Sequence, residues 1–220
     1  MNKAIVLLSG GLDSATTLYY AKSKGYDSHC LIFDYGQRHK QEIDLAKRIA
    51  RKCKSVYHVV KIALPWKGSA LLDKTMKVPT RGKFDKKTIP STYVPARNII
   101  FLSFAASYAE AIGAKAIFIG ANAIDYSGYP DCRPDFIKAY QLALKKGLKA
   151  GVEGKALVLK TPLIVKTKKQ IIALGRKLKV PYEMTWSCYH GGAKPCGKCD
   201  SCRIRKQGFE SLGIKDPALK

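Results

Sequence analysis

Residues 3–25 read KAIVLLSGGLDSATTLYYAKSKG, and this stretch decides the fold. The aliphatic run at residues 3–9 predicts a buried parallel strand that a glycine-rich turn ends. A helix is expected over residues 14–24, closed by Gly25 in the C′ position. A strand, two glycines and a helix in this order indicate a cradle for a phosphate group, because the helix N-terminus attracts anions.

The alternation of strand and helix continues along the chain. Strands are expected over residues 28–35, 56–62 and 115–122, and helices over residues 39–53, 96–113, 133–147 and 167–178. Thr167 and Gln170 have the spacing of a capping box at the start of the last of these helices. The pattern predicts an α/β protein with a doubly wound, mainly parallel sheet, whose ligands bind beyond the carboxyl ends of the strands.

Residues 65–93 interrupt this alternation with a segment rich in lysine, proline and glycine. A loop of this length in a compact domain is either disordered or a functional lid. We expect one α/β domain over residues 1–184, which includes this loop, and a separate C-terminal region over residues 185–220.

The charge balance favours anionic ligands. The 220 residues carry a formal net charge of +24, and lysine outnumbers arginine by 31 to 9, so much of the excess is typical of a solvated surface. The sequence contains no run of about 18 apolar residues, so no membrane-spanning helix is expected. The N-terminal apolar run is too short for a signal peptide, and a cytoplasmic protein is therefore expected.

The string SGGLDS, residues 9–14, lacks the Gly-Lys-Ser/Thr of a P-loop. Gly10 and Gly11 let backbone N–H groups approach an anion, and Ser9 and Ser14 can donate hydroxyl groups to phosphate oxygens. Asp13 suits such a cradle only if it caps the helix or holds Mg²⁺. The alternative interpretation is a tight turn with an N-capping residue.

Seven cysteines divide into two groups. Three are scattered and are expected to be inert apolar fillers: Cys30, Cys53 and Cys132. Four follow the spacing C-x7-C-x2-C-x2-C: Cys188, Cys196, Cys199 and Cys202. Four thiolates satisfy a tetrahedral Zn²⁺, so one structural zinc ion is predicted; an iron–sulfur cluster and reactive thiols are the alternatives.

The string SGGLDS resembles the PP-loop of the ATP pyrophosphatase superfamily. Members of this superfamily cut ATP between the α and β phosphates, and the loop holds the departing pyrophosphate. The resemblance implies that AMP is transferred to an oxygen of the substrate, which turns that oxygen into a good leaving group.

Further strings narrow the resemblance to the 7-cyano-7-deazaguanine synthase family. They are FDYGQRH (33–39), YVPARNIIFLSFAASYAE (93–110), GANAIDYSGYPDCRPDF (120–136), TPL (161–163) and SCYHGG with CGKCDSCRIR near the end. The resemblance implies a ligase that converts 7-carboxy-7-deazaguanine and ammonia to 7-cyano-7-deazaguanine. This conversion would use Mg·ATP and release AMP and pyrophosphate. The product is a precursor of queuosine and archaeosine in tRNA. Superfamily enzymes of this kind are often homodimers, and no direct nucleic-acid or membrane partner is expected.

The predicted site residues fall into three sets. The nucleotide is assigned to Leu7, Leu8, Ser9, Gly10, Gly11, Leu12, Asp13, Ser14, Ala15, Thr16 and Thr17. Catalysis is assigned to Ser9, Asp13, Ser14 and Arg97. The substrate is assigned to Arg97, Asn98, Asp125, Tyr129, Asp131 and Arg133, because a guanidinium binds carboxylates, an aspartate accepts from a guanine-like edge and a tyrosine stacks on a heterocycle.

Other assignments remain open. His39 is interpreted as part of a solvated helix start rather than as a general base. Lys166 and Lys168 can reach phosphates, although any one lysine in so basic a chain is more often a surface residue. A tRNA-modifying PP-loop enzyme that adenylates a base would use paired cysteines away from the metal, and the scattered cysteines lack that spacing. A zinc-ribbon nucleic-acid-binding module would leave the glycine-rich loop without a role.

Overall fold

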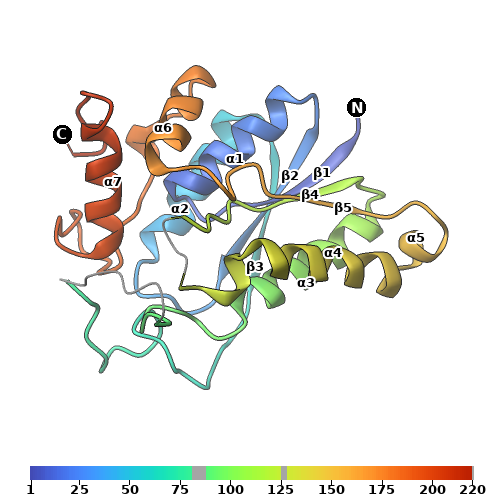
Figure 1. Cartoon of the computed structure of the whole chain (residues 1–220), viewed down its shortest axis with the longest axis horizontal. Coiled ribbons are helices and arrows are strands. Elements are labelled where there is room, and N and C mark those ends of the chain that lie inside the picture. Colours follow the sequence, from blue (N-terminus) through green and yellow to red (C-terminus); the bar gives the residue numbers. More distant parts are fainter. Residues whose placement is uncertain (81–87, 125–127, 220) are drawn as a thin grey trace.

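The computed structural model describes residues 1–80, 88–124 and 128–219. Five parallel strands form one sheet in the order β3-β2-β1-β4-β5 (Figure 1). Their bounds are β1 Lys3–Leu7, β2 Asp27–Asp34, β3 Val56–Lys61, β4 Ala116–Phe118 and β5 Val158–Lys160. The strand order reverses between β1 and β4, and such a switch point opens a crevice beyond the strand ends. The predicted doubly wound α/β fold is confirmed.

Helices cover both faces of this sheet (Figure 1). Their bounds are α1 Leu12–Ser23, α2 Gln41–Lys52, α3 Arg97–Ala111, α4 Pro134–Gly147, α5 Lys149–Val152, α6 Lys168–Lys177 and α7 Asp200–Glu210, with 3-10 turns η1 Pro130–Cys132 and η2 Tyr182–Met184. The capping box predicted at Thr167 and Gln170 is present at the start of α6. The sequence patterns did not predict β5 or α7.

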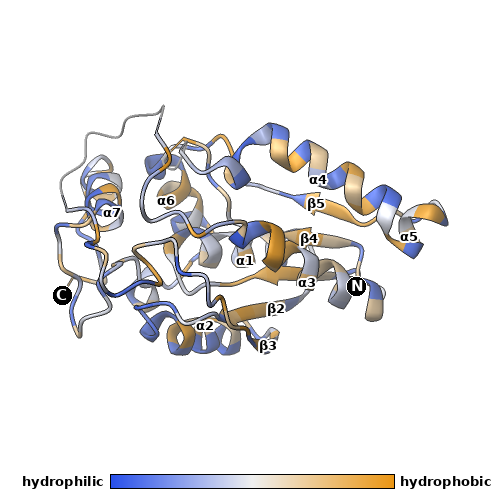
Figure 2. Ribbon diagram, turned by 90° about the horizontal axis from the view of Figure 1, so that it is seen from below, coloured by the Kyte–Doolittle hydropathy of each residue, from blue (hydrophilic) through white to orange (hydrophobic). Residues whose placement is uncertain are grey.

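Alternate residues of the strands supply two separate hydrophobic cores. Val6 of β1 belongs to a buried cluster with Leu18 of α1, whereas Ile5 belongs to a second cluster with Leu102 of α3. This alternation follows from the period of two residues along a strand. Hydrophobic residues predominate in the strands, whereas the helices mix hydrophobic and hydrophilic residues (Figure 2). None of the helices in the described part of the chain has the length and apolar character needed to span a lipid bilayer.

The C-terminal region packs against the main sheet domain. Phe209 of α7 shares a buried cluster with Ile172 of α6 and with Tyr182. A separate small cluster joins Trp186 and cysteine side chains to Ala70 of the lysine-rich segment. Phe209 thus packs the C-terminal region against α6, and the division at residue 184 stays a prediction.

The described residues of the lysine-rich segment, 65–80 and 88–93, form turns without a helix or strand. Ala70, Leu71 and Val78 are nevertheless buried. The backbone N–H of Arg38 donates to the carbonyl oxygen of Leu71 at 3.2 Å, and its guanidinium donates to the carbonyl oxygen of Met76 at 2.8 Å. These contacts hold this part of the segment against the body of the protein.

Candidate active site and metal centre

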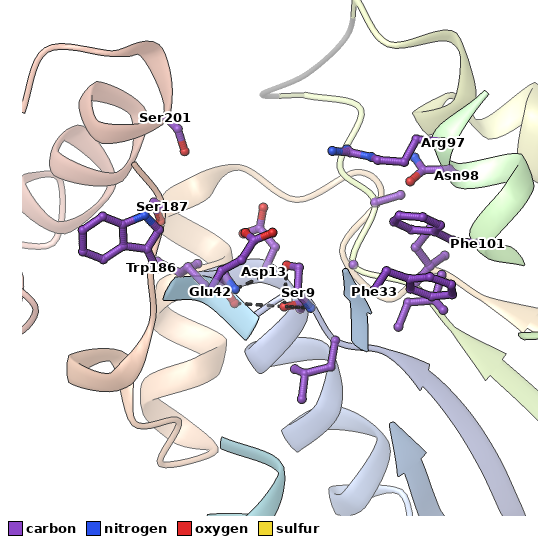
Figure 3. Close-up of a pocket in the computed structure, with 18 of the residues that line it drawn as sticks. Ser9, Asp13, Phe33, Glu42, Arg97, Asn98, Phe101, Trp186, Ser187 and Ser201 are labelled. Carbon is purple, nitrogen blue, oxygen red and sulfur yellow. Dashed lines mark hydrogen bonds between the residues drawn. The ribbon is translucent and has the colours of Figure 1, made fainter. Parts of the chain in front are cut away.

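A deep cavity opens beyond the carboxyl ends of β1, β2 and β4, where the fold places ligand sites. Its walls include Leu7 at the end of β1, Leu8 directly after it, Phe33 of β2 and Gly120 after β4. The empty space measures about 1350 Å³ with its open mouth included. Arg97 stands on one side of the cavity and Trp186 on the opposite side (Figure 3).

The glycine-rich loop forms the floor of this cavity and is held by its two serines. The Ser9 and Ser14 hydroxyl oxygens lie 3.0 Å apart, and the backbone N–H of Ser9 donates to Ser14 Oγ at 3.2 Å. Gly10 has φ = +81°, and a Cβ there would lie 2.4 Å from the carbonyl oxygen of Glu42. Only glycine fits this position without strain, because the backbone of α2 approaches so closely.

Helix α1 begins directly after the loop, with Gly11 as its N-cap residue and no side-chain cap hydrogen bond. Its first turn therefore presents backbone N–H groups and the positive end of the helix dipole to the cavity. The interpretation of Asp13 as an N-capping residue is wrong. This arrangement suits an anion such as a phosphate group.

Asp13 instead pairs with Lys168, the first residue of α6. Lys168 Nζ lies 2.7 Å from Asp13 Oδ1 and 2.8 Å from Asp13 Oδ2, and both side chains line the cavity. Lys168 is buried, so its interpretation as a surface residue is wrong. The Lys168 ammonium therefore lies beside the loop, with the negative charge of Asp13 in direct contact with it.

The structure brings most of the predicted nucleotide residues to the cavity. Those that line it are Leu7, Leu8, Ser9, Gly11, Leu12, Asp13 and Ser14. The others lie behind the lining: Gly10, Ala15, Thr16 and Thr17. Thr16 Oγ1 lies 2.9 Å from the Tyr182 hydroxyl and Thr17 Oγ1 donates to the Asp13 carbonyl at 2.9 Å, so these two residues brace α1.

The start of α3 supplies Arg97 and Asn98 to the cavity wall. Ala96 precedes them in the left-handed region, with φ = +54°, and this turn directs the helix start toward the cavity. The Arg97 guanidinium donates to the Tyr35 hydroxyl at 3.2 Å. Burial lowers the pKa of Arg97, but Tyr35, Tyr129 and Asp131 nearby raise it above its usual value, so the guanidinium stays charged.

Asp131 is buried and supports α3 from behind. Its Oδ2 accepts the backbone N–H of Asn98 at 3.1 Å, and its carbonyl oxygen accepts the Asn98 side-chain amide at 3.2 Å. Burial raises the pKa of Asp131, and the bonds to Asn98 and the charge of Arg97 oppose that rise. Asp131 does not line the cavity, and its predicted contact with substrate stays untested.

The remaining predicted substrate residues are dispersed. Tyr129 is buried in the cavity wall, where its hydroxyl lies 2.7 Å from Thr92 Oγ1. Arg133 is exposed and does not line the cavity. Asp125 lies outside the described residues.

Several lining residues were not assigned from the sequence. Phe33 and Phe101 stack with ring centroids 3.9 Å apart and form an aromatic wall near Arg97 (Figure 3). His39 also lines the cavity; it is buried, with Nε2 3.2 Å from Glu42 Oε2, so the solvated interpretation is wrong. Trp186 reaches the cavity from the segment before the cysteines. No periodic signal marks these residues, because the fold and not the sequence spacing brings them together.

The four-cysteine site consists of Cys188, Cys196, Cys199 and Cys202. Their Sγ atoms all lie within 4.8 Å of one another, whereas four thiolates on one zinc ion stand about 3.8 Å apart at a Zn–S distance of about 2.3 Å. This packing fits a single ion better than an iron–sulfur cluster, whose several irons hold the ligand sulfurs farther apart.

Backbone N–H groups support these sulfurs. Cys196 Sγ accepts from Lys198 N at 3.4 Å and from Cys199 N at 3.3 Å, and Cys188 Sγ accepts from Cys196 N at 3.3 Å. Hydrogen bonds from the Cys199 and Cys202 thiols, and from the backbone N–H groups of Cys196 and His190, lower the pKa of Cys188 well below its usual value. The same thiol hydrogen bonds to Cys188 raise the pKa of Cys199 and of Cys202.

The fold and the loop define the class of protein, an α/β protein with a PP-loop. NMN synthetase from Francisella tularensis shares the fold with a TM-score of 0.52 at 17% identity, over 97% of this chain and 78% of that chain. A 4-thiouridine synthetase, solved as an RNA complex with bound ATP, has a TM-score of 0.51 at 18% identity, over 99% of this chain and 52% of that chain.

A family model described as "Queuosine biosynthesis protein QueC" matches residues 3–213. A 7-cyano-7-deazaguanine synthase of Trichodesmium erythraeum is 51% identical, over 99% of this chain and 100% of that protein. One of Leptospira interrogans is 50% identical, over 98% of this chain and 89% of that protein. The chain belongs to the QueC family of 7-cyano-7-deazaguanine synthases, which are enzymes of queuosine biosynthesis.

Proposed function

We propose that this chain converts 7-carboxy-7-deazaguanine and ammonia into 7-cyano-7-deazaguanine and that it uses ATP as the activating co-substrate. One observation carries the proposal: the uncapped N-terminus of α1 and the loop of residues 9–14 form an anion site on the floor of a cavity that Arg97 also lines. The names of the relatives supply the particular substrate.

The proposed reaction has two adenylation steps. The substrate carboxylate attacks the α-phosphorus of ATP, the bond to the β-phosphate oxygen breaks, and pyrophosphate leaves as a unit. Ammonia then displaces AMP from the acyl-adenylate and gives the amide after loss of a proton. The amide oxygen attacks a second ATP, and the nitrile forms when AMP departs with that oxygen and the nitrogen loses its remaining protons. Each nitrile therefore requires two ATP molecules.

The described residues suit these steps in two groups. The N–H groups at the start of α1, with Ser9 and Ser14, are suited to hold the departing pyrophosphate, and Lys168 adds a positive charge nearby. On the other side, the charged Arg97 is suited to hold the substrate carboxylate. The aromatic wall of Phe33 and Phe101 offers an apolar surface to a flat heterocycle.

We further propose that the four-cysteine site holds one zinc ion with a structural role. All four coordination positions would be filled by thiolates, so the ion supplies stability and no open position for chemistry. Among the described residues, the carboxylates that line the cavity are Asp13 and Glu42, and both already have partners in Lys168 and His39. We therefore expect Mg²⁺ to enter with the phosphates of ATP.

An isotope experiment tests the reaction. The enzyme is incubated with Mg·ATP, ammonium and 7-carboxy-7-deazaguanine that carries ¹⁸O at both carboxylate oxygens. Two AMP molecules should form per nitrile, each with one ¹⁸O, because each adenylation transfers one substrate oxygen to phosphorus. Formation of ADP, or ¹⁸O in inorganic phosphate, would contradict the mechanism.

Adenylation of a tRNA base is the second candidate, since the fold also occurs in a 4-thiouridine synthetase. That chemistry would need a reactive thiol in the cavity. Cys132 lines the cavity, but burial raises its pKa to about 12, which keeps it protonated and unreactive. A homodimer stays a prediction, and light scattering on the purified enzyme would test it.

A further inference from the structure

Trp186 lies between the four-cysteine site and the glycine-rich loop, and hydrogen bonds connect it to both. Its backbone N–H donates to the carbonyl oxygen of Gly10 at 2.9 Å. Its indole Nε1–H donates to the carbonyl oxygen of Cys188 at 2.8 Å. One residue therefore joins the floor of the cavity to a residue whose sulfur belongs to the four-cysteine site.

The packing of the Trp186 side chain makes the same connection. The ring is 9% exposed and belongs to a cluster with Ala70, Cys188, Cys199 and Cys202. The same residue lines the cavity, on the side opposite Arg97 (Figure 3). A change in the cysteine turns would therefore move a side chain that ligands in the cavity also contact.

The loop has little freedom to absorb such a movement. A Cβ at Gly10 would lie 2.4 Å from the Glu42 carbonyl oxygen, so the backbone of α2 bounds the loop on one side. The hydrogen bond from Trp186 N holds the same residue through its carbonyl oxygen. The position of the phosphate-binding N–H groups thus depends on where Trp186 lies.

We propose that Trp186 is a positioning residue that couples metal occupancy of the four-cysteine site to ATP binding in the cavity. The inference rests on the proposed function in one respect, because it requires that the cavity binds ATP. The metal orders the turn at Cys188, this turn holds the indole through the carbonyl oxygen, and the backbone of Trp186 then holds Gly10 in its binding conformation.

Thermodynamic linkage gives the proposal a reciprocal consequence. If zinc strengthens ATP binding by some factor, ATP must strengthen zinc binding by the same factor. A single coupled contact of this kind predicts a factor of about five to ten. A role of Trp186 that is only structural would change the stability of the protein without making zinc affinity depend on ATP.

The chain has two tryptophans, and Trp66 is 58% exposed. The experiment therefore uses Trp66→Phe as the background variant, so that the tryptophan fluorescence comes from Trp186. Zinc is partitioned between the zinc-loaded variant and a chromophoric chelator, with and without saturating ATP. We expect ATP to raise the zinc affinity about five- to tenfold. We also expect the Trp186 fluorescence to shift to the red when the chelator removes zinc, as its ring loses apolar contacts.

The matched variant carries Trp66→Phe together with Trp186→Phe. Phenylalanine keeps an aromatic ring but has no indole N–H, so the bond to the Cys188 carbonyl is lost while the backbone bond to Gly10 can remain. In this variant we expect nearly the same zinc affinity with and without ATP. The direct affinity of ATP for zinc affects both proteins equally, and the far-ultraviolet circular dichroism of both shows whether they are folded.

The outcomes separate the inference from the proposed function. If the zinc-loaded Trp66→Phe protein binds no ATP by calorimetry, the proposed function fails. If it binds ATP but zinc affinity is the same with and without ATP, or if both variants show the same coupling, the inference fails alone. If the Trp186→Phe variant does not fold, the fluorescence of the Trp66→Phe protein tests the inference instead. ATP should then shift the Trp186 emission more in the zinc-loaded protein than in the zinc-free protein. An equal shift in both forms would contradict the inference.

Discussion

Lys168 Nζ contacts both carboxylate oxygens of Asp13, at 2.7 and 2.8 Å, across 155 residues of sequence. The Lys168 side chain is 9% exposed and that of Asp13 is 19% exposed. Loss of a carboxylate that contacts a buried cation is costly, because less of the desolvation penalty of the cation is then compensated. This pair joins the first turn of α1 to α6 beside the glycine-rich loop.

The first prediction concerns this ion pair. Asp13→Asn should destabilise the protein by about 3 kcal/mol, because it removes the carboxylate that contacts the buried Lys168 ammonium through both of its oxygens. Lys47→Met is the matched control, since the partner of Lys47 is the exposed Asp44, and it should cost about 0–1 kcal/mol. Urea unfolding measures both values, and equal costs for the two variants would contradict the prediction.

The second prediction concerns the loop glycine. Gly10→Ala should abolish ATP binding and destabilise the protein, since Cβ would clash with the Glu42 carbonyl at a position with φ = +81°. Gly25→Ala has a similar φ of +77° with no atom within 4 Å of the added Cβ, and should cost only about 1 kcal/mol. Calorimetric titration with ATP separates the two variants, and an ATP affinity retained in Gly10→Ala would argue against the assigned role of the loop.

The third prediction concerns strain at the start of α3. Ala96 has φ = +54°, where glycine is favoured, so Ala96→Gly should stabilise the protein by about 1 kcal/mol. The same change at Lys54, with φ = +50°, should stabilise it similarly. Only Ala96→Gly should weaken substrate binding, because it loosens the turn that directs Arg97. Thermal unfolding and the KM for the carboxylate substrate measure these effects, and a lower stability of both variants would show that the strain is absent.

The fourth prediction concerns the metal. Cys199→Ser should lower the zinc content from about one ion per chain to less than half of that, because serine replaces one of the four thiolates. Cys53→Ser should leave the zinc content unchanged, since Cys53 is not part of the four-cysteine site. Metal analysis by mass spectrometry gives both values. An iron–sulfur absorption band in the wild-type protein would contradict the zinc assignment.

The fifth prediction concerns pH. Burial raises the pKa of Asp131 above its ordinary value, so the folded protein binds this proton more tightly than the unfolded chain does. The contribution of Asp131 to the free energy of unfolding must then decrease as pH rises from about 4 through the raised pKa. Asp131→Asn lacks this titration, so the wild-type protein should lose stability relative to the variant over that range. Urea unfolding of both proteins at several pH values tests the sign of this effect. A wild-type protein that gains stability relative to Asp131→Asn as pH rises would refute the prediction.

The sequence predicted the elements with a strong local signal. The strand, loop and helix of residues 3–25 appeared as expected, because an aliphatic run, two glycines and a helix-forming stretch act over short distances. The sequence did not predict β5, because three residues are too few to show the alternation of a strand. It did not predict α7 either, because this helix begins within the cysteine motif. The sequence did not predict that Lys168 and His39 are buried. Burial of a polar side chain depends on partners elsewhere in the fold, which local patterns do not reveal.

The sequence by itself determined the class of fold, the glycine-rich loop between β1 and α1 and the cluster of four cysteines, because each depends on residues that are close in the chain. The tertiary structure alone decided that Asp13 pairs with Lys168, that Asp131 supports α3 and that Trp186 connects the cysteines to the loop. These contacts join segments up to 176 residues apart (Gly10 and Trp186). They depend on how the helices pack on the sheet, and no local pattern encodes that packing.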